Sequence, residues 1–271
     1  MTDDKLIDFQ NHVFTYDGKS RTVFRQGSGP AVIVMAEFPG ISPMVFDFAR
    51  RVAAIGCTAV VPHLYGSPGR DPSPAAHGLV AALANVAGQI GPVCISREFV
   101  VLATGRTSPV VHWLRALAGS EHQRCGGPGV GAVGMCFTGG FALAMAVDDR
   151  LIAPVLSQPG LPLAFTRRQK CAIDVCPSDM ARIKNRCAEG LTVMGLRFRG
   201  DRRSPAERFE FLRNQLGDAF LAIELEDADA NPEGVLSPHS VLTEHLVDEP
   251  GQPTQIALHR VLDFLRTRLV C

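Results

Sequence analysis

Apolar residues along the chain fall into two patterns that alternate from one end to the other. Short runs that are apolar almost throughout predict strands covered on both faces; they span residues 31–36, 57–61, 130–134, 153–156, 191–196 and 219–225. Stretches with apolar residues on one helical face lie between and around them, at 43–55, 79–87, 110–117, 139–147, 204–216 and 255–269. This order predicts an α/β fold, with a mostly parallel central sheet and helices on both faces.

Turn and cap residues refine these boundaries. An Asp-Gly pair inside residues 11–24 predicts a hairpin ahead of the first buried strand. Ser42, Ser108 and Ser204 each stand just before a helical stretch, where a hydroxyl can accept from the free backbone N–H groups. We expect each of the three serines to be an N-cap, Ser204 within a capping box.

The segment 160–190 is long for a connection between two strands, and it is rich in basic side chains. We expect an inserted cap that contains a helix with Ser178 as its N-cap. Such an insert either covers an edge of the core or roofs the active site. No repeat or linker is visible elsewhere, so residues 1–271 are expected to form one domain that carries this cap.

Composition excludes several classes of protein. Lys plus Arg and Asp plus Glu both number 27, and no basic stripe is visible, so a nucleic-acid partner is not expected. The most apolar stretch, at 78–95, contains amides, glycines and a proline, which argues against a membrane span. The first 14 residues lack the apolar run of a secretory signal, so we expect a cytoplasmic protein.

The 8 cysteines are expected to be reduced thiols, because disulfides are rare in that compartment. No C-x-x-C pair occurs. The closest pair, Cys171 and Cys176, has no second cluster with metal-ligand spacing. We therefore expect neither a metal nor a cofactor, and the sequence leaves the oligomeric state open.

The motif richest in chemistry is GAVGMCFTGG at residues 131–140, between a buried strand and an Ala-rich helix. A tight turn of this kind lifts a nucleophile above the sheet and needs small neighbours two residues away. Gly134 satisfies this requirement on one side of Cys136, whereas Thr138 departs from it on the other. A thiol at a helix N-terminus is favoured as thiolate, and the Phe137 amide could stabilise an oxyanion.

Two ordinary interpretations compete with this one. Cys136 could be one more buried cysteine, which is a common fate of that residue. A glycine-rich turn can also bind phosphate, but this motif lacks the Lys-Ser/Thr end of a P-loop and the dinucleotide-binding spacing.

Candidate partners for a nucleophile follow it in the chain order nucleophile, acid, histidine, which is the order of an α/β-hydrolase triad. Asp201 follows the strand at 191–196, and His239 lies in a loop before the last helix. His245 and His259 fall in stretches of helical character, and we expect them at the surface. Asp201 could instead cap the following helix, but Ser204 is better placed for that.

Together these residues resemble the dienelactone hydrolase family of α/β-hydrolases over almost the whole chain. Glu-Phe-Pro-Gly-Ile at 37–41 and Pro-His-Leu-Tyr at 62–65 are similar to two of its loops, with His63 in place of an aspartate. The resemblance implies that Cys136 is the nucleophile, His239 the base and Asp201 the residue that orients it. Glu37 would hold the resting thiol, and the amides of Phe38 and Phe137 would form the oxyanion hole.

This chain departs from the family pattern at two positions that bind the substrate. The family places a carboxylate-binding arginine four residues after the histidine, where this chain has Thr243. A second family arginine precedes the elbow, and Arg97 or Arg106 could supply it. Arg97 and Tyr65 are our candidate substrate-binding residues.

The expected activity is hydrolysis of a small carboxylic ester, lactone or thioester through an acyl-Cys136 intermediate. A redox-responsive protein with a reactive Cys136 is one alternative. A noncatalytic binding protein with a hydrolase fold is another.

Overall fold

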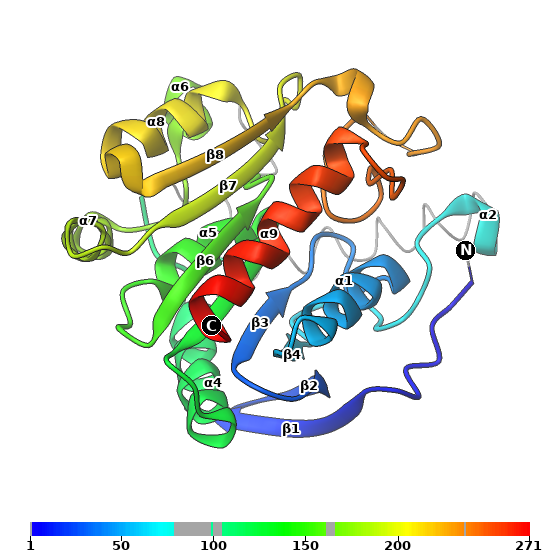
Figure 1. Cartoon of the computed structure of the whole chain (residues 1–271), viewed down its shortest axis with the longest axis horizontal. Helices are drawn as coiled ribbons and strands as arrows, with labels where there is room; N and C mark the ends of the chain where they lie inside the picture. The colour runs from blue at the N-terminus through cyan, green and yellow to red at the C-terminus, as the bar shows by residue number, and fades with distance from the viewer. Residues whose placement is uncertain (1, 79–98, 100–104, 161–165, 236) are drawn as a thin grey trace.

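The structure is a computed structural model that describes residues 2–78, 99, 105–160, 166–235 and 237–271. An eight-stranded sheet with the order β1-β2-β4-β3-β5-β6-β7-β8 lies at its centre (Figure 1). β1 and β2 pair antiparallel, as do β2 and β4, and the remaining pairs are parallel. The strands are β1 (Gln10–Tyr16), β2 (Lys19–Gly27), β3 (Ala31–Met35), β4 (Thr58–Pro62), β5 (Val130–Met135), β6 (Leu151–Ser157), β7 (Val193–Phe198) and β8 (Phe220–Leu225).

Helices cover both faces of this sheet, which confirms the predicted fold class. The described helices are α1 (Pro43–Ala54), α2 (Pro74–His77), α4 (Val110–Cys125), α5 (Thr138–Met145), α6 (Arg167–Cys171), α7 (Pro177–Ala188), α8 (Ala206–Leu216) and α9 (Pro253–Leu269). Short 3₁₀ turns occupy Gly217–Ala219 and Asp227–Asp229. The helix predicted at 79–87 lies outside the described residues.

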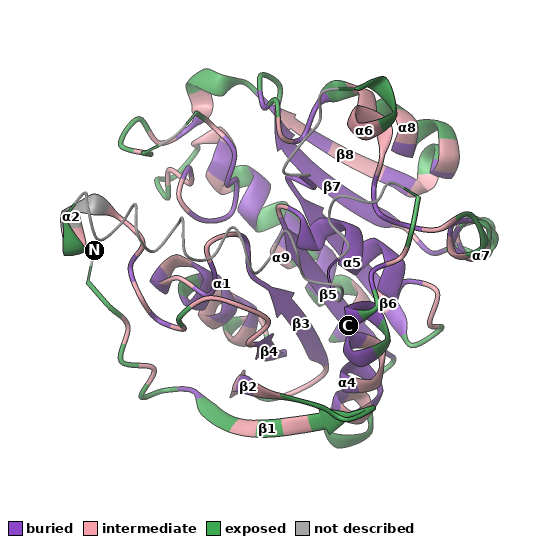
Figure 2. Ribbon diagram, turned by 180° about the vertical axis from the view of Figure 1, so that it is seen from behind, coloured by how far each residue is buried: buried purple, intermediate pink, exposed green. Residues whose placement is uncertain are grey.

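Two hydrophobic cores, one on each face, explain why the strands are apolar throughout. In β3, Val32 and Val34 point into the core beneath α1 and α9. Ile33 and Met35 point into the core shared by α4, α5, α7 and α8. Every residue of β3 is buried, since successive side chains of a strand point to opposite faces. Figure 2 shows the central strands, such as β3 and β5, as buried between the two sets of helices, whereas the edge strand β1 is largely exposed.

The predicted N-caps have mixed outcomes. Ser42 caps α1 as expected, since its hydroxyl accepts from the Val45 amide. Ser108 does not cap α4: its hydroxyl donates to the Phe99 carbonyl, and Pro109 occupies the cap position without a side-chain bond.

The N-cap predictions for Ser204 and Ser178 are wrong. Pro205 occupies the cap position of α8, while the Ser204 hydroxyl is buried without a hydrogen-bond partner among the described residues. Cys176 is the N-cap of α7, so Ser178 lies inside that helix. In both cases a proline at or next to the cap sets where the helix begins, because proline fits the first turn.

α6 and α7 are the described helices of the segment 160–190, of which residues 161–165 lie outside the described part. α7 connects β6 to the neighbouring β7 and packs against α5 and α8. Its buried Arg186 donates to the carbonyls of Ala146 and Leu151. This helix therefore anchors the segment to the core, and a role of the segment as a cap stays a prediction.

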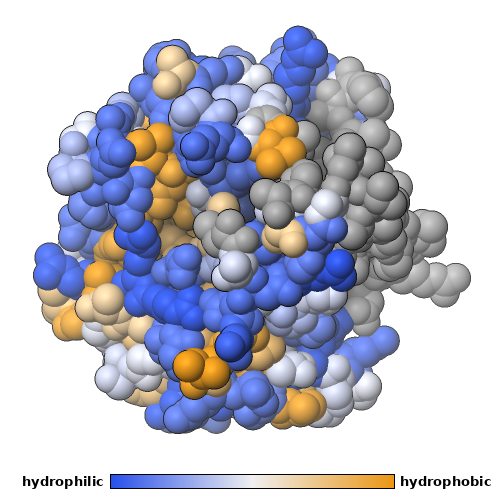
Figure 3. Space-filling view, turned by 90° about the vertical axis from the view of Figure 1, so that its right-hand side faces the viewer, coloured by the Kyte–Doolittle hydropathy of each residue, from blue (hydrophilic) through white to orange (hydrophobic). Residues whose placement is uncertain are grey.

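No described helix is long and apolar enough to cross a membrane. The face in Figure 3 is mostly hydrophilic, and its hydrophobic side chains gather in small separate groups.

Candidate functional site

Cys136 sits on a sharp turn between β5 and α5. Its φ is +56°, a left-handed conformation that residues other than glycine rarely adopt. The backbone is fixed there because the Cys136 amide donates to the Ser157 carbonyl and its own carbonyl accepts from Gly139 and Gly160, each at 3.0 Å. A strained turn held in this way is the geometry of a nucleophile elbow.

Gly134 and Thr138 close this elbow. A Cβ on Gly134 would lie 2.1 Å from the Thr138 carbonyl oxygen, so only glycine fits. The buried Thr138 hydroxyl accepts from the Met135 amide (2.8 Å) and lies 3.1 Å from the Met35 carbonyl oxygen. The threonine that departs from the usual glycine pattern thus ties the turn to the end of β3.

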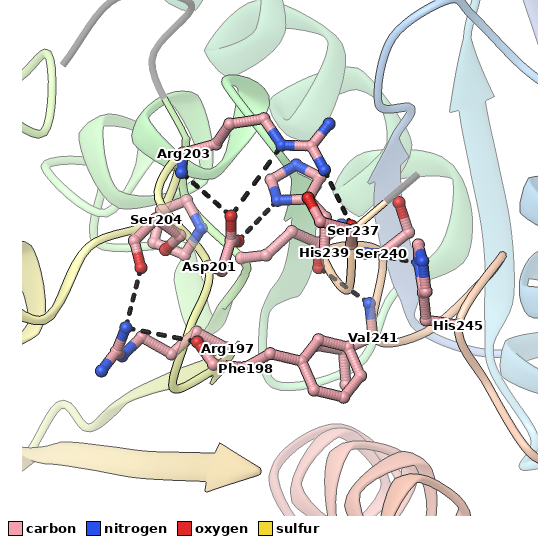
Figure 4. A network of polar contacts seen from close by, with 12 residues as sticks. Arg197, Phe198, Asp201, Arg203, Ser204, Ser237, His239, Ser240, Val241 and His245 are labelled. Atoms are coloured by element: carbon pink, nitrogen blue, oxygen red, sulfur yellow. Dashed lines mark hydrogen bonds and ion pairs between the residues drawn. The ribbon is translucent and has the colours of Figure 1, made fainter. Parts of the chain in front are cut away.

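Asp201 and His239 are in direct contact. Asp201 follows β7, and its Oδ1 accepts from the Arg203 amide at 2.9 Å. His239 Nδ1 donates to Asp201 Oδ2 at 2.6 Å, with both side chains buried (Figure 4). Burial by itself would raise the pKa of Asp201, but the hydrogen bond and charge of His239 lower it below the ordinary value.

Gly160 marks where Cys136 and His239 meet. A Cβ on this glycine would lie 3.3 Å from Cys136 Sγ and 3.4 Å from His239 Cε1. Burial lowers the pKa of His239, but the negative charges of Cys136 and Asp201 outweigh it and raise that pKa to about 10. The electrostatics therefore favour a protonated His239 ring beside Cys136.

Glu37, just after the end of β3, is hydrogen-bonded to the loop that carries His239. Its Oε2 accepts from the Ser240 hydroxyl (2.6 Å) and from Gln158 Nε2 (2.9 Å). Its Oε1 accepts from the Thr243 hydroxyl. All four side chains are buried, so neutral donors surround the carboxylate.

Two residues of this network were not predicted from the sequence. Gln158 is fully buried with φ +36°, and its Oε1 also accepts from the Val241 amide at 3.4 Å. His245 was expected at the surface but is buried, where its Nδ1 accepts from the Ser240 amide at 3.3 Å. Both contacts join segments that are distant in the chain or lie inside an irregular loop, where no periodic pattern exposes them.

Arg208 ties the surrounding loops together. Its guanidinium is fully buried and donates to the carbonyls of Pro159, Arg203, Ala172 and Gln169. Arg208 thereby links the loop after β6, the loop after β7 and α6 next to the candidate site.

The remaining candidate site residues are the two phenylalanines of the expected oxyanion hole, Tyr65 and two arginines. Phe38 and Phe137 directly follow Glu37 and Cys136 in the chain, and a role of their amides in an oxyanion hole stays a prediction. Tyr65 packs against Phe137, with 5.2 Å between ring centroids, and its hydroxyl donates to the Ala36 carbonyl.

Of the two candidate arginines, Arg106 is exposed and Arg97 lies outside the described residues. Within the described part of the chain, no group of three or more His, Cys, Asp or Glu could hold a metal ion.

The family model of the dienelactone hydrolase family matches residues 19–173, more than half of the chain. The chain belongs to the dienelactone hydrolase family. It is therefore a carboxylic ester hydrolase. The matched residues include Glu37 and Cys136, whereas Asp201 and His239 lie beyond them. No curated protein sequence matches significantly.

Solved structures share the fold of this dienelactone hydrolase family member. A dienelactone hydrolase-like promiscuous phosphotriesterase from metagenomic libraries aligns with a TM-score of 0.59 and 15% identity, covering 96% of this chain and 98% of its own. A cold-adapted esterase from an Arctic intertidal metagenomic library aligns with a TM-score of 0.53 and 15% identity, covering 98% and 97%.

Thr243 lies beyond the residues that the family model matches. It stands where the family resemblance implies a carboxylate-binding arginine, and here its hydroxyl donates to Glu37. This family member thus has a short neutral side chain at that position, whose hydrogen bond runs inward to the site.

Proposed function

We propose that this hydrolase cleaves a small carboxylic ester, lactone or thioester through an acyl intermediate on Cys136. The observation that carries the proposal is the 2.6 Å contact between Asp201 and His239, beside a cysteine on a left-handed elbow. A base held in one tautomer next to a positioned nucleophile is the arrangement that acyl transfer requires.

In the first half-reaction, Cys136 Sγ attacks the acyl carbonyl carbon and an S–C bond forms. The carbonyl π electrons move to the oxygen, and the amides of Phe38 and Phe137 would donate to it. When the tetrahedral intermediate collapses, the bond to the leaving group breaks and His239 gives its proton to the departing oxygen or sulfur. An acyl-Cys136 thioester and a neutral imidazole remain.

In the second half-reaction, His239 takes a proton from water while the water oxygen attacks the thioester carbon. The S–C bond then breaks, which releases the acid and restores the thiolate beside an imidazolium. Asp201 supports both steps, because its carboxylate holds Nδ1 protonated and balances the positive charge on the ring.

Glu37 would act indirectly in this scheme. Its hydrogen bonds to Ser240 and Thr243 fix the loop that presents His239, so it would position the base. This role differs from the direct hold on the thiol that the family resemblance implies.

Acid-quenched intact-mass measurement with a small panel of activated esters, lactones and thioesters tests the proposal. We expect an adduct of the acyl mass on Cys136 in the native chain and none in Cys136→Ala, which should also lose turnover. Cys271→Ala, at the exposed C-terminus, is the matched control and should behave like the native chain. Wild-type rates for Cys136→Ala on every cleaved ester would contradict the assignment.

A further inference from the structure

The N-terminal segment, residues 2–8, is bonded to a loop that follows β4. The Asp4 amide donates to the Gly69 carbonyl at 2.8 Å. Asp3 Oδ1 accepts from the Asp71 amide at 2.9 Å. Figures 1 and 2 both show this end of the chain next to α2, the helix that comes after the loop. Two successive acidic residues of the segment therefore bind the main chain of the loop.

Arg50 of α1 anchors the N-terminal segment to the body of the protein. Its Nη1 donates to Asp4 Oδ2 and its Nε to Asp8 Oδ2, each at 2.7 Å. The guanidinium also lies over the Phe9 ring, 5.2 Å from the ring centroid. Several charges on one guanidinium form a network, which holds its geometry better than an isolated surface pair. The segment is thus tied to α1 on one side and to the loop on the other.

The same loop packs against the segment that carries Phe38, whose amide is an expected oxyanion donor. The Gly69 amide donates to the Ile41 carbonyl at 2.8 Å. A Cβ on Gly66 would lie 2.3 Å from the Pro39 carbonyl oxygen, so the two backbones are in direct contact. Gly69 is therefore bonded to the N-terminal segment through its carbonyl and to the Phe38 segment through its amide.

We propose that Asp3 and Asp4 are positioning residues of this hydrolase, which hold the Phe38 amide in place for the developing oxyanion through the loop at residues 66–71. A donor stabilises an oxyanion best when it is already in position, because it then has no reorganisation to undergo. A main-chain amide in a loop depends on its neighbours for that position. The inference rests on the proposed function and assigns a role to charged residues that the mechanism does not otherwise use.

A matched ester and thionoester test this role. The thionoester carries sulfur in place of the carbonyl oxygen, and sulfur is a weak hydrogen-bond acceptor, so its hydrolysis depends less on the oxyanion donors. The ratio of kcat/KM for the two substrates cancels any change in the amount of folded enzyme. We expect the double variant Asp3→Ala/Asp4→Ala to lower the ratio of ester to thionoester by roughly tenfold, part of the roughly 10²-fold or more that loss of a whole oxyanion donor costs.

Asp47→Ala is the matched control for the change in charge. Asp47 Oδ1 accepts from the same Arg50 at 2.8 Å, but Asp47 lies on α1 and not in the N-terminal segment. This variant should leave the ratio unchanged. An unchanged ratio in the double variant would overturn the inference. An equal fall in Asp47→Ala would also overturn it, since the effect would then belong to the charge around Arg50.

Gly69→Ala disturbs the same contact from the side of the loop. A Cβ there would lie 2.5 Å from the Asp4 carbonyl oxygen, whereas a Cβ on Gly18 would meet nothing within 4 Å. Both glycines have a positive φ, +75° and +69°, so alanine strains the backbone at either position. We expect the ratio to fall in Gly69→Ala and to stay unchanged in Gly18→Ala. A fall in both variants would trace the effect to backbone strain and refute the positioning role.

Hydrogen exchange tests the positioning role without catalysis. We expect the protection of the Gly69 amide to fall by roughly fivefold or more in the double variant, the scale of one hydrogen bond. The Cys136 amide, which donates to the Ser157 carbonyl, should keep its protection. Unchanged protection of Gly69 would refute the positioning role. Absence of any acyl-Cys136 would refute the proposed function instead, and the exchange measurement would still report on the N-terminal segment.

Discussion

The Thr243 hydroxyl donates to the Glu37 carboxylate, which also accepts from the hydroxyl of Ser240, the residue after His239. One carboxylate therefore holds two points of the histidine loop against the end of β3. Where the family resemblance predicts a long cation reaching the substrate, this chain has a short hydroxyl that strengthens the frame of the site.

Thr243→Val should destabilise the fold, because it removes a donor from a buried carboxylate without changing the shape of the side chain. We expect a loss of about 1.5–3 kcal/mol in the free energy of unfolding, measured with urea. Thr15→Val, which removes an exposed hydroxyl bonded to Ser20, should cost less than about 0.5 kcal/mol. Equal stability of the two variants would show that the Glu37 contact contributes nothing.

Cys136→Ala should lower the pKa of His239. Although burial favours the neutral ring, the Cys136 charge is the largest of the influences that raise this pKa to about 10. Titration of the His239 Cε1 proton by NMR measures the change, with Cys271→Ala as the control. If the His239 pKa stayed near 10 without the sulfur, the imidazolium would have to be stabilised by Asp201 alone.

Asp201→Asn should leave the fold intact and slow ester hydrolysis by roughly 10³- to 10⁴-fold. The amide keeps the size of the carboxylate but donates a hydrogen bond to Nδ1, which leaves the ring in the wrong tautomer, as known for serine proteases. Steady-state kinetics measure the loss, and circular dichroism checks the fold. A decrease below tenfold would contradict an orienting role for Asp201.

The strands, most helices and the positions of Cys136, Asp201 and His239 could be predicted from the sequence. Those features follow local rules: an apolar run marks a buried strand, and chain order marks candidates for nucleophile, acid and base. The hydrogen bonds that hold the segments of the site together could not be predicted in this way. Gln158 reaches Glu37 across 121 residues of sequence, and no spacing rule describes such a contact.

The predictions of where two helices begin are wrong for a different physical reason. Ser108 and Ser204 each match the cap pattern, but a proline follows each of them and occupies the cap position itself. The sequence pattern shows Thr138 only as a departure from the elbow motif, because its hydroxyl contacts become visible only once β3 lies beside β5.

Asp174→Asn should stabilise the protein in mildly alkaline solution. Both carboxyl oxygens of Asp174 are buried without a hydrogen-bond partner among the described residues, and burial raises the pKa to about 8 despite the nearby Arg208. The native state therefore holds a proton that the unfolded chain releases near its ordinary pKa of 3.8. The stability linked to this proton is fully present below that value and is lost as pH rises through about 8.

Asparagine cannot ionise, so the variant should lose less stability between pH 5 and 8 and exceed the native chain by about 1 kcal/mol or more at pH 8. Urea unfolding at several pH values measures the difference. Parallel pH profiles for Asp174→Asn and the native chain would show that Asp174 is ionised in the fold.

The distance along the chain between the residues of the site also determines when the site can form during protein synthesis. Glu37 and Ser240 are separated by 203 residues, and the histidine precedes only the last helix. During synthesis, which proceeds from the N-terminus, the elbow strand and its cysteine leave the ribosome well before the imidazole that pairs with it. Under the proposed mechanism, a nascent or C-terminally truncated chain would therefore carry Cys136 without His239, and hydrolytic competence would arise only once the last part of the polypeptide had docked.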